Sequence, residues 1–476
     1  MNRLEFKDSA FNQNLIFVTE DDPWQWVIAL EHASFLKTEQ KSSFVIYIAH
    51  SYVHEVKNLM KRLLGWKGAR HNVKNALNEL GVSCVALRAF SMPLRHHSIS
   101  IFELRKVIYP GIVAATGKRS LRSIKGLLTL VQSFQKSLRI LNILRQFDLI
   151  SRTNMCYVPN GKIVSAAVTV QSLRKLNFRV QILESGSKPD RLQVWSHSAQ
   201  SQFEADSLMA LMWDRESVVL RERKARKYFE GRRDTKTLDP YHLVSWASLT
   251  TKELLPNFEH GKKIATFYSS SQIEQIGADS QSPLNFQDQG DALKSVLELL
   301  KPNEWSVYLR KHPVPNLANS FFDDEDDIWS KLKGFKHLRV IESTEKTDSF
   351  ALAAKSDIVF HYNSSIGAEI IYFQLAPVVT MGITSWSSLQ AGYSAQNHGE
   401  LEHLLTGHNL QIENPEKILP WAFFHSEFGE PFKIVVLAEN NTWKIQDSNI
   451  HPDFRSYLRN KLTQGRSLLG QRKRSK

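Results

Sequence analysis

Two adjacent serines, Ser364 and Ser365, stand where a predicted strand turns into a predicted helix. One hydroxyl group would be enough for an N-cap, an interaction worth about 1 kcal/mol. A second hydroxyl group, beside the N–H groups and the positive dipole of a helix N-terminus, suits an anion such as phosphate. Gly367 would let a ligand or a neighbouring backbone come close, and a packing role explains it equally well. We expect Glu369, one turn into the helix, either to reach the ribose of a nucleotide or to face solvent.

A second group of polar residues ends the predicted strand WSVYLRKHP, residues 305–313. Arg310, Lys311 and His312 come last, and Pro313 stops the hydrogen-bond ladder. They would also be explained simply as the polar residues that commonly follow the end of a strand. However, they fall in the same half of the chain as the serine pair, and three such donors beside a central strand suit a phosphate or a nucleotide.

Two further loops add weaker candidates. Ser270 lies in the serine run 269–271 after the first predicted strand of the second half, where it caps a helix, binds an anion or does both. Glu184 and Gly186 follow a predicted strand of the first half, in QILESGSKPD. A carboxylate on a glycine loop can act as general base toward a hydroxyl group, although a turn carboxylate is the simpler interpretation.

Composition predicts a globular protein of two or three domains. The chain has 476 residues, 42% of them hydrophobic, which is enough for packed cores. Cys84 and Cys156 cannot build a disulfide framework and favour a reducing compartment. No run resembles a signal peptide or a membrane-spanning helix, which predicts a cytoplasmic protein. No P-loop, GxSxG, HExxH or GxGxxG motif occurs, so we expect no metal and no cofactor.

The net positive charge favours an anionic partner. Lys and Arg outnumber Asp and Glu by 61 to 48, giving a net charge of +13. Residues 105–145 contain nine basic residues and no acidic residue, threaded with apolar residues. This segment is either a basic amphipathic helix on the anionic inner face of the cytoplasmic membrane or a core-packed helix with a solvated face. The basic end of the chain, 459–476, is a frayed terminus or a second membrane contact.

Strand-like and helix-like segments alternate in both halves of the chain. Residues 14–20, 42–50 and 83–90 have the apolar, partly β-branched character of buried strands. The alternation resumes with a strand at 262–271 and continues to residue 382. This pattern predicts the α/β class, with two Rossmann-like domains whose parallel sheets are covered on both faces. Ligands of such sheets bind beyond the carboxyl ends of the strands.

This alternation divides the chain into four parts. The parts are a Rossmann-like domain at 1–215, a charged helix and linker at 216–260, a second Rossmann-like domain at 261–425, and a helical, basic tail at 426–476.

Five motifs in this order resemble the bacterial capsular and surface polysaccharide glycosyltransferases of the GT-B fold, a group that includes polysialyltransferases and capsule Kdo transferases. They are LESGS, YSSSQIE, NFQDQGDAL, RKHP and NSSIGAEIIYFQLAPVV, all within residues 180–382. The resemblance implies two domains facing a central cleft, with the acceptor on the first and a nucleotide donor on the second. It implies that Glu184 is the general base, that His312 contacts the nucleotide, and that Ser364 with Ser365 holds its phosphate. Polysialyltransferases usually have two adjacent acids before the glycine, whereas this chain has one.

The resemblance implies an inverting, metal-independent transfer from a nucleotide sugar to a polysaccharide or lipid-linked glycan. One alternative is a glycerophosphotransferase of the same fold that uses CDP-glycerol. A second is a non-catalytic, basic nucleic-acid-binding protein, and a third is a degenerate transferase kept as an assembly scaffold. No nucleic-acid recognition motif occurs, so we expect no specific nucleic-acid partner.

Overall fold

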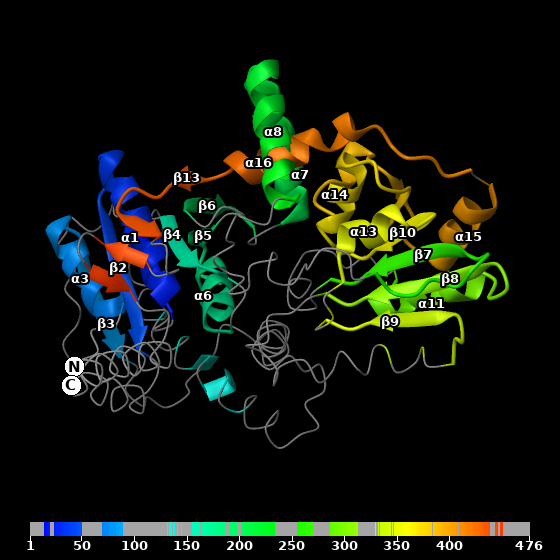
Figure 1. The fold of residues 1–476 in the computed structure, drawn as a ribbon. Coiled ribbons are helices and arrows are strands. Elements are labelled where there is room, and N and C mark those ends of the chain that lie inside the picture. The colour runs from blue at the N-terminus through cyan, green and yellow to red at the C-terminus, as the bar shows by residue number, and fades with distance from the viewer. Residues whose placement is uncertain are drawn as a thin grey trace, which may run out of the picture.

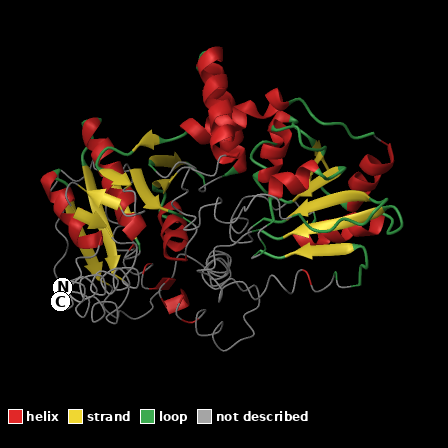
Figure 2. Cartoon of the chain, in the orientation of Figure 1, coloured by secondary structure: helices red, strands yellow, loops and turns green. Residues whose placement is uncertain are grey.

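The computed structural model contains two large β-sheets, each with helices packed against it, and a small third sheet (Figures 1 and 2). Single residues between 131 and 144 and most of 329–345 are described. The other described ranges are 14–19, 23–49, 69–88, 155–161, 164–185, 190–197, 201–233, 255–270, 286–312, 347–382, 384–407, 409–437, 443–445 and 448–450.

The first sheet has the strand order β13-β6-β5-β4-β1-β2-β3. The five strands from β5 to the edge strand β3 run parallel, whereas β6 is antiparallel to β5 and β13 to β6. The strands are β1 (Asn14–Val18), β2 (Ser43–Ala49), β3 (Ser83–Arg88), β4 (Met155–Pro159), β5 (Arg179–Ser185), β6 (Arg191–Trp195) and β13 (Glu430–Pro431). The helices of this domain are α1 (Pro23–Thr38), α3 (Ala69–Glu79) and α6 (Val164–Lys175).

The second sheet is parallel throughout, with the strand order β12-β11-β10-β7-β8-β9. The strands are β7 (Lys263–Tyr268), β8 (Trp305–Arg310), β9 (Leu338–Ile341), β10 (Ile358–His361), β11 (Val378–Thr380) and β12 (Tyr393–Ser394). Its helices are α11 (Gln289–Leu299), α13 (Ser349–Ala354), α14 (Ile366–Tyr372) and α15 (His398–Gly407). Short 3₁₀ turns lie at Ser387–Leu389 and Pro415–Ile418.

Alternate residues of the central strands enter different cores. In β1, Leu15 and Phe17 belong to one hydrophobic cluster, and Ile16 and Val18 belong to another. Side chains alternate between the two faces of a strand, so this division means that both faces of the sheet are covered. The predicted α/β class with two Rossmann-like domains is confirmed, as are the predicted strands at 14–20, 42–50 and 83–90.

Three helices join the two domains: α7 (Gln202–Arg215), α8 (Val218–Arg233) and α16 (Leu419–Glu427). Figure 1 shows them between the two sheets. Helix α8 falls in the linker region 216–260, in the charged stretch 215–238 that was predicted to be an exposed helix and linker. The helix is confirmed, but Ala225 and Phe229 on it are fully buried. Phe229 stacks on Tyr372 of α14 at a centroid distance of 4.2 Å, which ties α8 to the second domain.

The C-terminal segment returns to the first domain. Residues 426–476 were predicted to form a helical tail, and this is wrong for the part that the structure describes beyond α16. There, β13 pairs with β6, and β14 (Val435–Leu437), β15 (Trp443–Ile445) and β16 (Ser448–Ile450) form an antiparallel sheet. The backbone N–H groups of Lys433, Ile434 and Val435 all donate to the carboxylate of Glu31 on α1.

The basic segment 105–145 lies mostly outside the described residues. Its described positions between 131 and 144 are helical. Ile140 and Leu144 are buried in the core, and Phe134 and Leu138 pack against it. For these positions the core-packed interpretation holds. The basic end of the chain, 459–476, lies outside the described residues.

Candidate functional site

The second sheet has a topological switch point between β7 and β10. The chain runs from β7 outward to β8 and β9, then returns to the other side of β7 and continues through β10, β11 and β12. In open α/β sheets, ligands bind at the carboxyl ends of the strands beside such a point. The parallel strands β10, β7 and β8 are neighbours, so the loops that follow them start at the same edge. The predicted residues near 270, 310–312 and 364–365 are therefore brought together there.

Hydrogen bonds tie the loops after β7 and β8 to each other. The Ser269 backbone N–H donates to the Arg310 carbonyl at 3.1 Å, and its hydroxyl oxygen accepts from the His312 N–H at 2.8 Å. Ser270 is held by Gln289 at the start of α11, which accepts from its N–H at 3.0 Å and donates to its carbonyl at 3.3 Å. Ser269 belongs to the serine run 269–271 that was predicted to cap a helix, to bind an anion or to do both. It fixes the backbone on which the His312 side chain, itself half-buried, is presented.

Arg310 and Lys311, predicted to serve a phosphate, are directed at the turn that follows β9. The Arg310 guanidinium donates to the carbonyls of Glu342 and Glu345 at 2.7 and 3.1 Å. Burial lowers the pKa of Arg310, although Tyr268 and Glu345 act in the opposite sense. The Lys311 ammonium lies 2.9 Å from the Glu342 carboxylate. Both cations therefore stabilise the β9 turn.

The serine pair does not cap its helix in the predicted way. Ser365 occupies the N-cap position of α14 with helical backbone angles, φ −58° and ψ −22°, and its side chain makes no cap hydrogen bond. An N-cap residue that accepts from the helix usually has extended backbone angles. The Ser365 side chain is exposed, whereas Ser364 is 9% exposed. The surplus hydroxyl on which the phosphate hypothesis depends is thus present at the surface of the turn.

His361, the last residue of β10, had no predicted role. It is fully buried, and its Nδ1 accepts from the Ser364 N–H at 3.3 Å. Its Nε2 lies 2.9 Å from the Thr380 hydroxyl on β11, and its ring stacks on Trp386 at a centroid distance of 5.6 Å. The available sequence signal was its position, three residues before the serine pair at the end of a strand.

Gly367 and Glu369 are both explained by packing. A Cβ atom at position 367 would lie 2.3 Å from the Nε2 of His361, so any side chain there would collide with the imidazole ring. Glu369 is 5% exposed and pairs with Arg232 of α8 at 2.5 Å. The expectation that Glu369 faces solvent is wrong, and its carboxylate is directed at α8.

Glu184 lies at the end of β5, at the carboxyl edge of the first sheet, and is 8% exposed. Asn160, directly after β4, donates from its side chain to the Glu184 carboxylate at 3.3 Å. The Ser185 N–H donates to the other carboxylate oxygen at 3.1 Å. Asn160 has a positive φ of 72°, a conformation that asparagine tolerates better than most residues.

Two predicted loop-forming residues, Gly186 and Pro313, lie outside the described residues. Within the described part of the chain, no cluster of three or more His, Cys, Asp or Glu side chains is arranged to hold a metal ion. Of the helices described, none combines the length and the apolar character needed to cross a membrane.

The sequence matches no protein-family model and no curated protein. Structural similarity is weak and spread over the whole chain. A UDP-GlcNAc 2-epimerase from Methanocaldococcus jannaschii is 11% identical, with 86% of this chain and 97% of that chain covered and a TM-score of 0.30. A trehalose-6-phosphate synthase from Burkholderia multivorans is 10% identical, with coverage of 87% and 94% and a TM-score of 0.32. MurG from Acinetobacter baumannii is 9% identical, with coverage of 88% and 96% and a TM-score of 0.24. Matches at this level carry no argument about activity.

Proposed function

We propose that this protein is a glycosyltransferase of the GT-B type, which transfers a sugar from a nucleotide donor to a growing cell-surface glycan. The observation that carries the proposal is that the loops after β8 and β10, with His312 and the serine pair, start on either side of β7 at the same edge of an all-parallel sheet. Parallel α/β sheets bind nucleotides at such points, and hydroxyl and N–H donors there stabilise a departing phosphate.

The proposed reaction is a single displacement with inversion at the sugar carbon. Glu184 takes the proton of the acceptor hydroxyl group as its oxygen attacks the sugar, and the bond to the nucleotide phosphate breaks. Ser364, Ser365 and His312 receive the phosphate that leaves. No metal enters this scheme. The acceptor, a polysaccharide or a lipid-linked glycan, would bind to the first domain, with the chain peripheral to the inner face of the membrane.

A donor panel tests the class of reaction. The wild-type protein is titrated with CMP-, UDP- and GDP-sugars and with CDP-glycerol, and stabilisation against thermal unfolding is measured. We expect one nucleotide sugar to raise the melting temperature, since a ligand present at 100 times its Kd stabilises the folded state by about 2.7 kcal/mol. Stabilisation by CDP-glycerol alone would instead favour the glycerophosphotransferase. A response to none of these donors would contradict the proposal.

Three substitutions then test the assigned residues. Ser365→Ala and His312→Ala should weaken donor binding, with Ser207→Ala on the exposed face of α7 as the matched control. Glu184→Gln should keep donor affinity and lower turnover by about 10²–10⁴-fold, the usual contribution of a general base. Its control is Glu430→Gln, an exposed glutamate of the same sheet. Full donor binding and turnover in both Ser365→Ala and His312→Ala would refute the site.

A further inference from the structure

One buried side chain, that of His361, supports the turn between β10 and α14. His361 is 0% exposed and contacts three separate elements of the second domain. Its Nδ1 meets the backbone N–H of Ser364, its Nε2 meets the Thr380 hydroxyl at the end of β11, and its ring lies against Gly367 in the first turn of α14. The position of this ring therefore sets the position of the serine turn.

The hydrogen bonds of His361 determine its protonation. A backbone N–H can only donate, so Nδ1 must be the unprotonated nitrogen of the ring. The single proton of a neutral imidazole then lies on Nε2 and is donated to the Thr380 oxygen. Burial lowers the pKa of His361 to about 3, which is consistent with a neutral ring. One tautomer satisfies both contacts, and a protonated ring would lose the contact with Ser364.

The helix that follows is fitted to the ring. Gly367 is the second residue of α14, and a Cβ atom there would lie 2.3–2.8 Å from three imidazole atoms. The ring also stacks on Trp386 at an interplanar angle of 27°. The imidazole is thus confined by an aromatic ring, a helix backbone and two hydrogen bonds.

We infer that His361 is a positioning residue that holds the Ser364–Ser365 turn in the geometry required to bind the donor phosphate. The effect of His361 on phosphate binding rests on the proposed function. Its action on the turn rests on the hydrogen bond to Ser364 and the contact with Gly367 alone. His361 does not touch the phosphate and acts through the backbone of the turn.

Two substitutions of His361 separate its two contacts. Asn places an amide oxygen near the site of Nδ1 and can still accept from the Ser364 N–H, whereas Gln places its polar group near the site of Nε2. Hydrogen–deuterium exchange of the peptide that spans 361–372 reports the order of the turn without any ligand. Affinities for CMP, UDP and GDP report the consequence for binding. The control is His425→Gln, a half-buried histidine on α16 whose pKa is also lowered by burial.

We expect His361→Gln to speed exchange across the turn and to weaken binding of the responsive nucleotide by about tenfold, the factor expected for one lost hydrogen bond. His361→Asn should restore both properties to within about threefold of wild type, and His425→Gln should change neither. If Asn and Gln behave alike, or if exchange of the turn does not respond to Gln, the inference is overturned.

A second pair of variants covers the case in which His361→Gln does not fold. Thr380→Val leaves the Nε2–H of the intact imidazole buried without an acceptor, a cost that His361→Asn does not have, so it should displace the ring and speed exchange of the turn. Thr380→Ser keeps the hydroxyl group and should not speed exchange. Equal exchange in these two variants would overturn the inference. If wild type binds none of the nucleotides while the exchange pattern is as expected, the proposed function fails and the positioning of the turn by His361 stands.

Discussion

A single fully buried histidine explains a glycine and a threonine in different parts of the second domain. His361 excludes any side chain at position 367, accepts from the Ser364 backbone and contacts the Thr380 hydroxyl. Gly367 is therefore required by volume and not by backbone conformation, since it is not among the described residues with a positive φ. This gives a prediction that does not depend on any ligand.

Gly367→Ala should destabilise the protein by about 1–3 kcal/mol, the usual cost of forcing an extra carbon into a packed site. The measurement is the free energy of unfolding in urea. The matched control is Gly399→Ala, because Gly399 is likewise the second residue of its helix, α15, and a Cβ atom there would meet only Asn397 at 3.6 Å. That control should be neutral or stabilise by up to about 1 kcal/mol. Equal effects at both positions would show that the imidazole ring of His361 moves aside at little cost, which would contradict the prediction.

At the scale of elements, α8 connects to three other segments through charged side chains. Arg232 pairs with the buried Glu369 of α14, Arg226 pairs with the exposed Glu416, and Lys224 pairs with Glu427 of α16. The surroundings of these pairs differ. The Glu369 side chain is 6% exposed, whereas that of Glu416 is 49% exposed. Burial weakens the screening of an ion pair, so the same chemistry should contribute different free energies.

Removing Glu369 by Glu369→Gln should lower the free energy of unfolding by about 1.5–3 kcal/mol, because Arg232 loses a charge-assisted hydrogen bond. Glu416→Gln breaks the exposed pair with Arg226, which lies on α8 like Arg232. It should cost no more than about 1 kcal/mol. Double-mutant cycles with Arg232→Gln and Arg226→Gln isolate the two coupling energies. A coupling at Arg232–Glu369 no larger than at Arg226–Glu416 would contradict this prediction.

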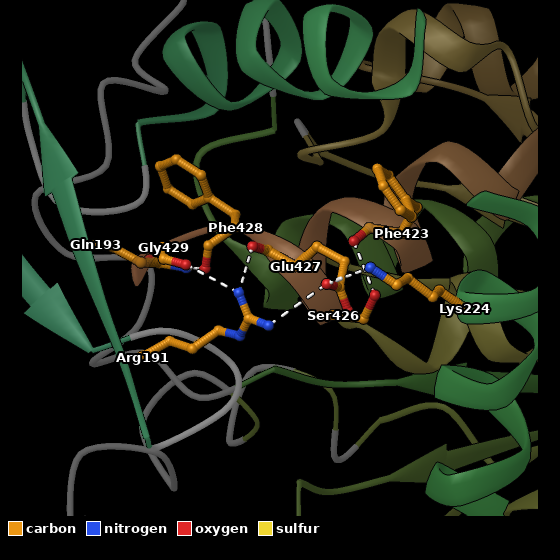
Figure 3. A network of polar contacts seen from close by, with 8 residues as sticks. All are labelled: Arg191, Gln193, Lys224, Phe423, Ser426, Glu427, Phe428 and Gly429. Atoms are coloured by element: carbon orange, nitrogen blue, oxygen red, sulfur yellow. Dashed lines mark hydrogen bonds and ion pairs between the residues drawn. The ribbon is translucent and has the colours of Figure 1, made fainter. Parts of the chain in front are cut away.

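At the scale of the whole molecule, one glutamate connects the first sheet to the helices that join the domains (Figure 3). Arg191 of β6 donates to the Glu427 carbonyl at 2.8 Å and to the Gly429 carbonyl at 2.9 Å, and it reaches the Glu427 carboxylate at 3.4 Å. Lys224 of α8 lies 2.8 Å from the same carboxylate. Arg191 and Glu427 are each 17% exposed, so this network lies partly below the surface.

Glu427→Gln keeps the shape of the side chain and removes the charge shared by two cations. We expect a loss of about 1.5–3 kcal/mol in the free energy of unfolding. Glu413→Gln, which breaks a pair with Lys417 four residues further along the chain, is the control and should cost no more than about 1 kcal/mol. Equal losses from the two substitutions would mean that the network adds nothing to an ordinary surface pair.

Three histidines with a lowered pKa should make the fold sensitive to acid. Burial lowers the pKa of His32, His361 and His425 from 6.5 to about 3, with Lys41 adding to the effect at His32 and Arg232 at His425. Below pH 6.5 the unfolded chain binds protons that the folded chain does not, so stability falls as the pH falls toward 3. Each histidine contributes up to about 1.4 kcal/mol per pH unit. Glu31 acts in the opposite sense, because burial raises its pKa.

The free energy of unfolding, measured in urea at pH 7, 6 and 5, tests this. His32→Leu should remove about 1 kcal/mol per pH unit from the slope below pH 6.5. Neither ring nitrogen of His32 has a hydrogen-bond partner in the part of the chain that the structure describes, so the leucine variant loses no hydrogen bond of the His32 side chain. His197→Gln, whose side chain is 70% exposed, should leave the slope unchanged. An unchanged slope in His32→Leu would rule out His32 as a source of the acid sensitivity.

The sequence alone was sufficient for the α/β class and for the strands that carry the site. Those strands are buried on both faces, so they appear as continuous apolar runs that end in polar residues, as at Arg310 and at Ser364. The short strands β4 and β6 were not identified, and the C-terminal strands were mistaken for a helical tail. These elements depend on partners far along the chain, such as Glu31 for residues 433–435, and local periodicity carries no record of such partners.

The tertiary structure decided which polar residues belong to the candidate site. Strand order made the loops after β7, β8 and β10 neighbours along one edge, and that order cannot be read from the sequence. Contacts between elements directed Arg310 and Lys311 to the β9 turn and Glu369 to α8, although all three residue types suit a nucleotide. The same contacts gave His361 its role. Residue chemistry is thus local and visible in the sequence, whereas the direction of each side chain depends on what packs beside it.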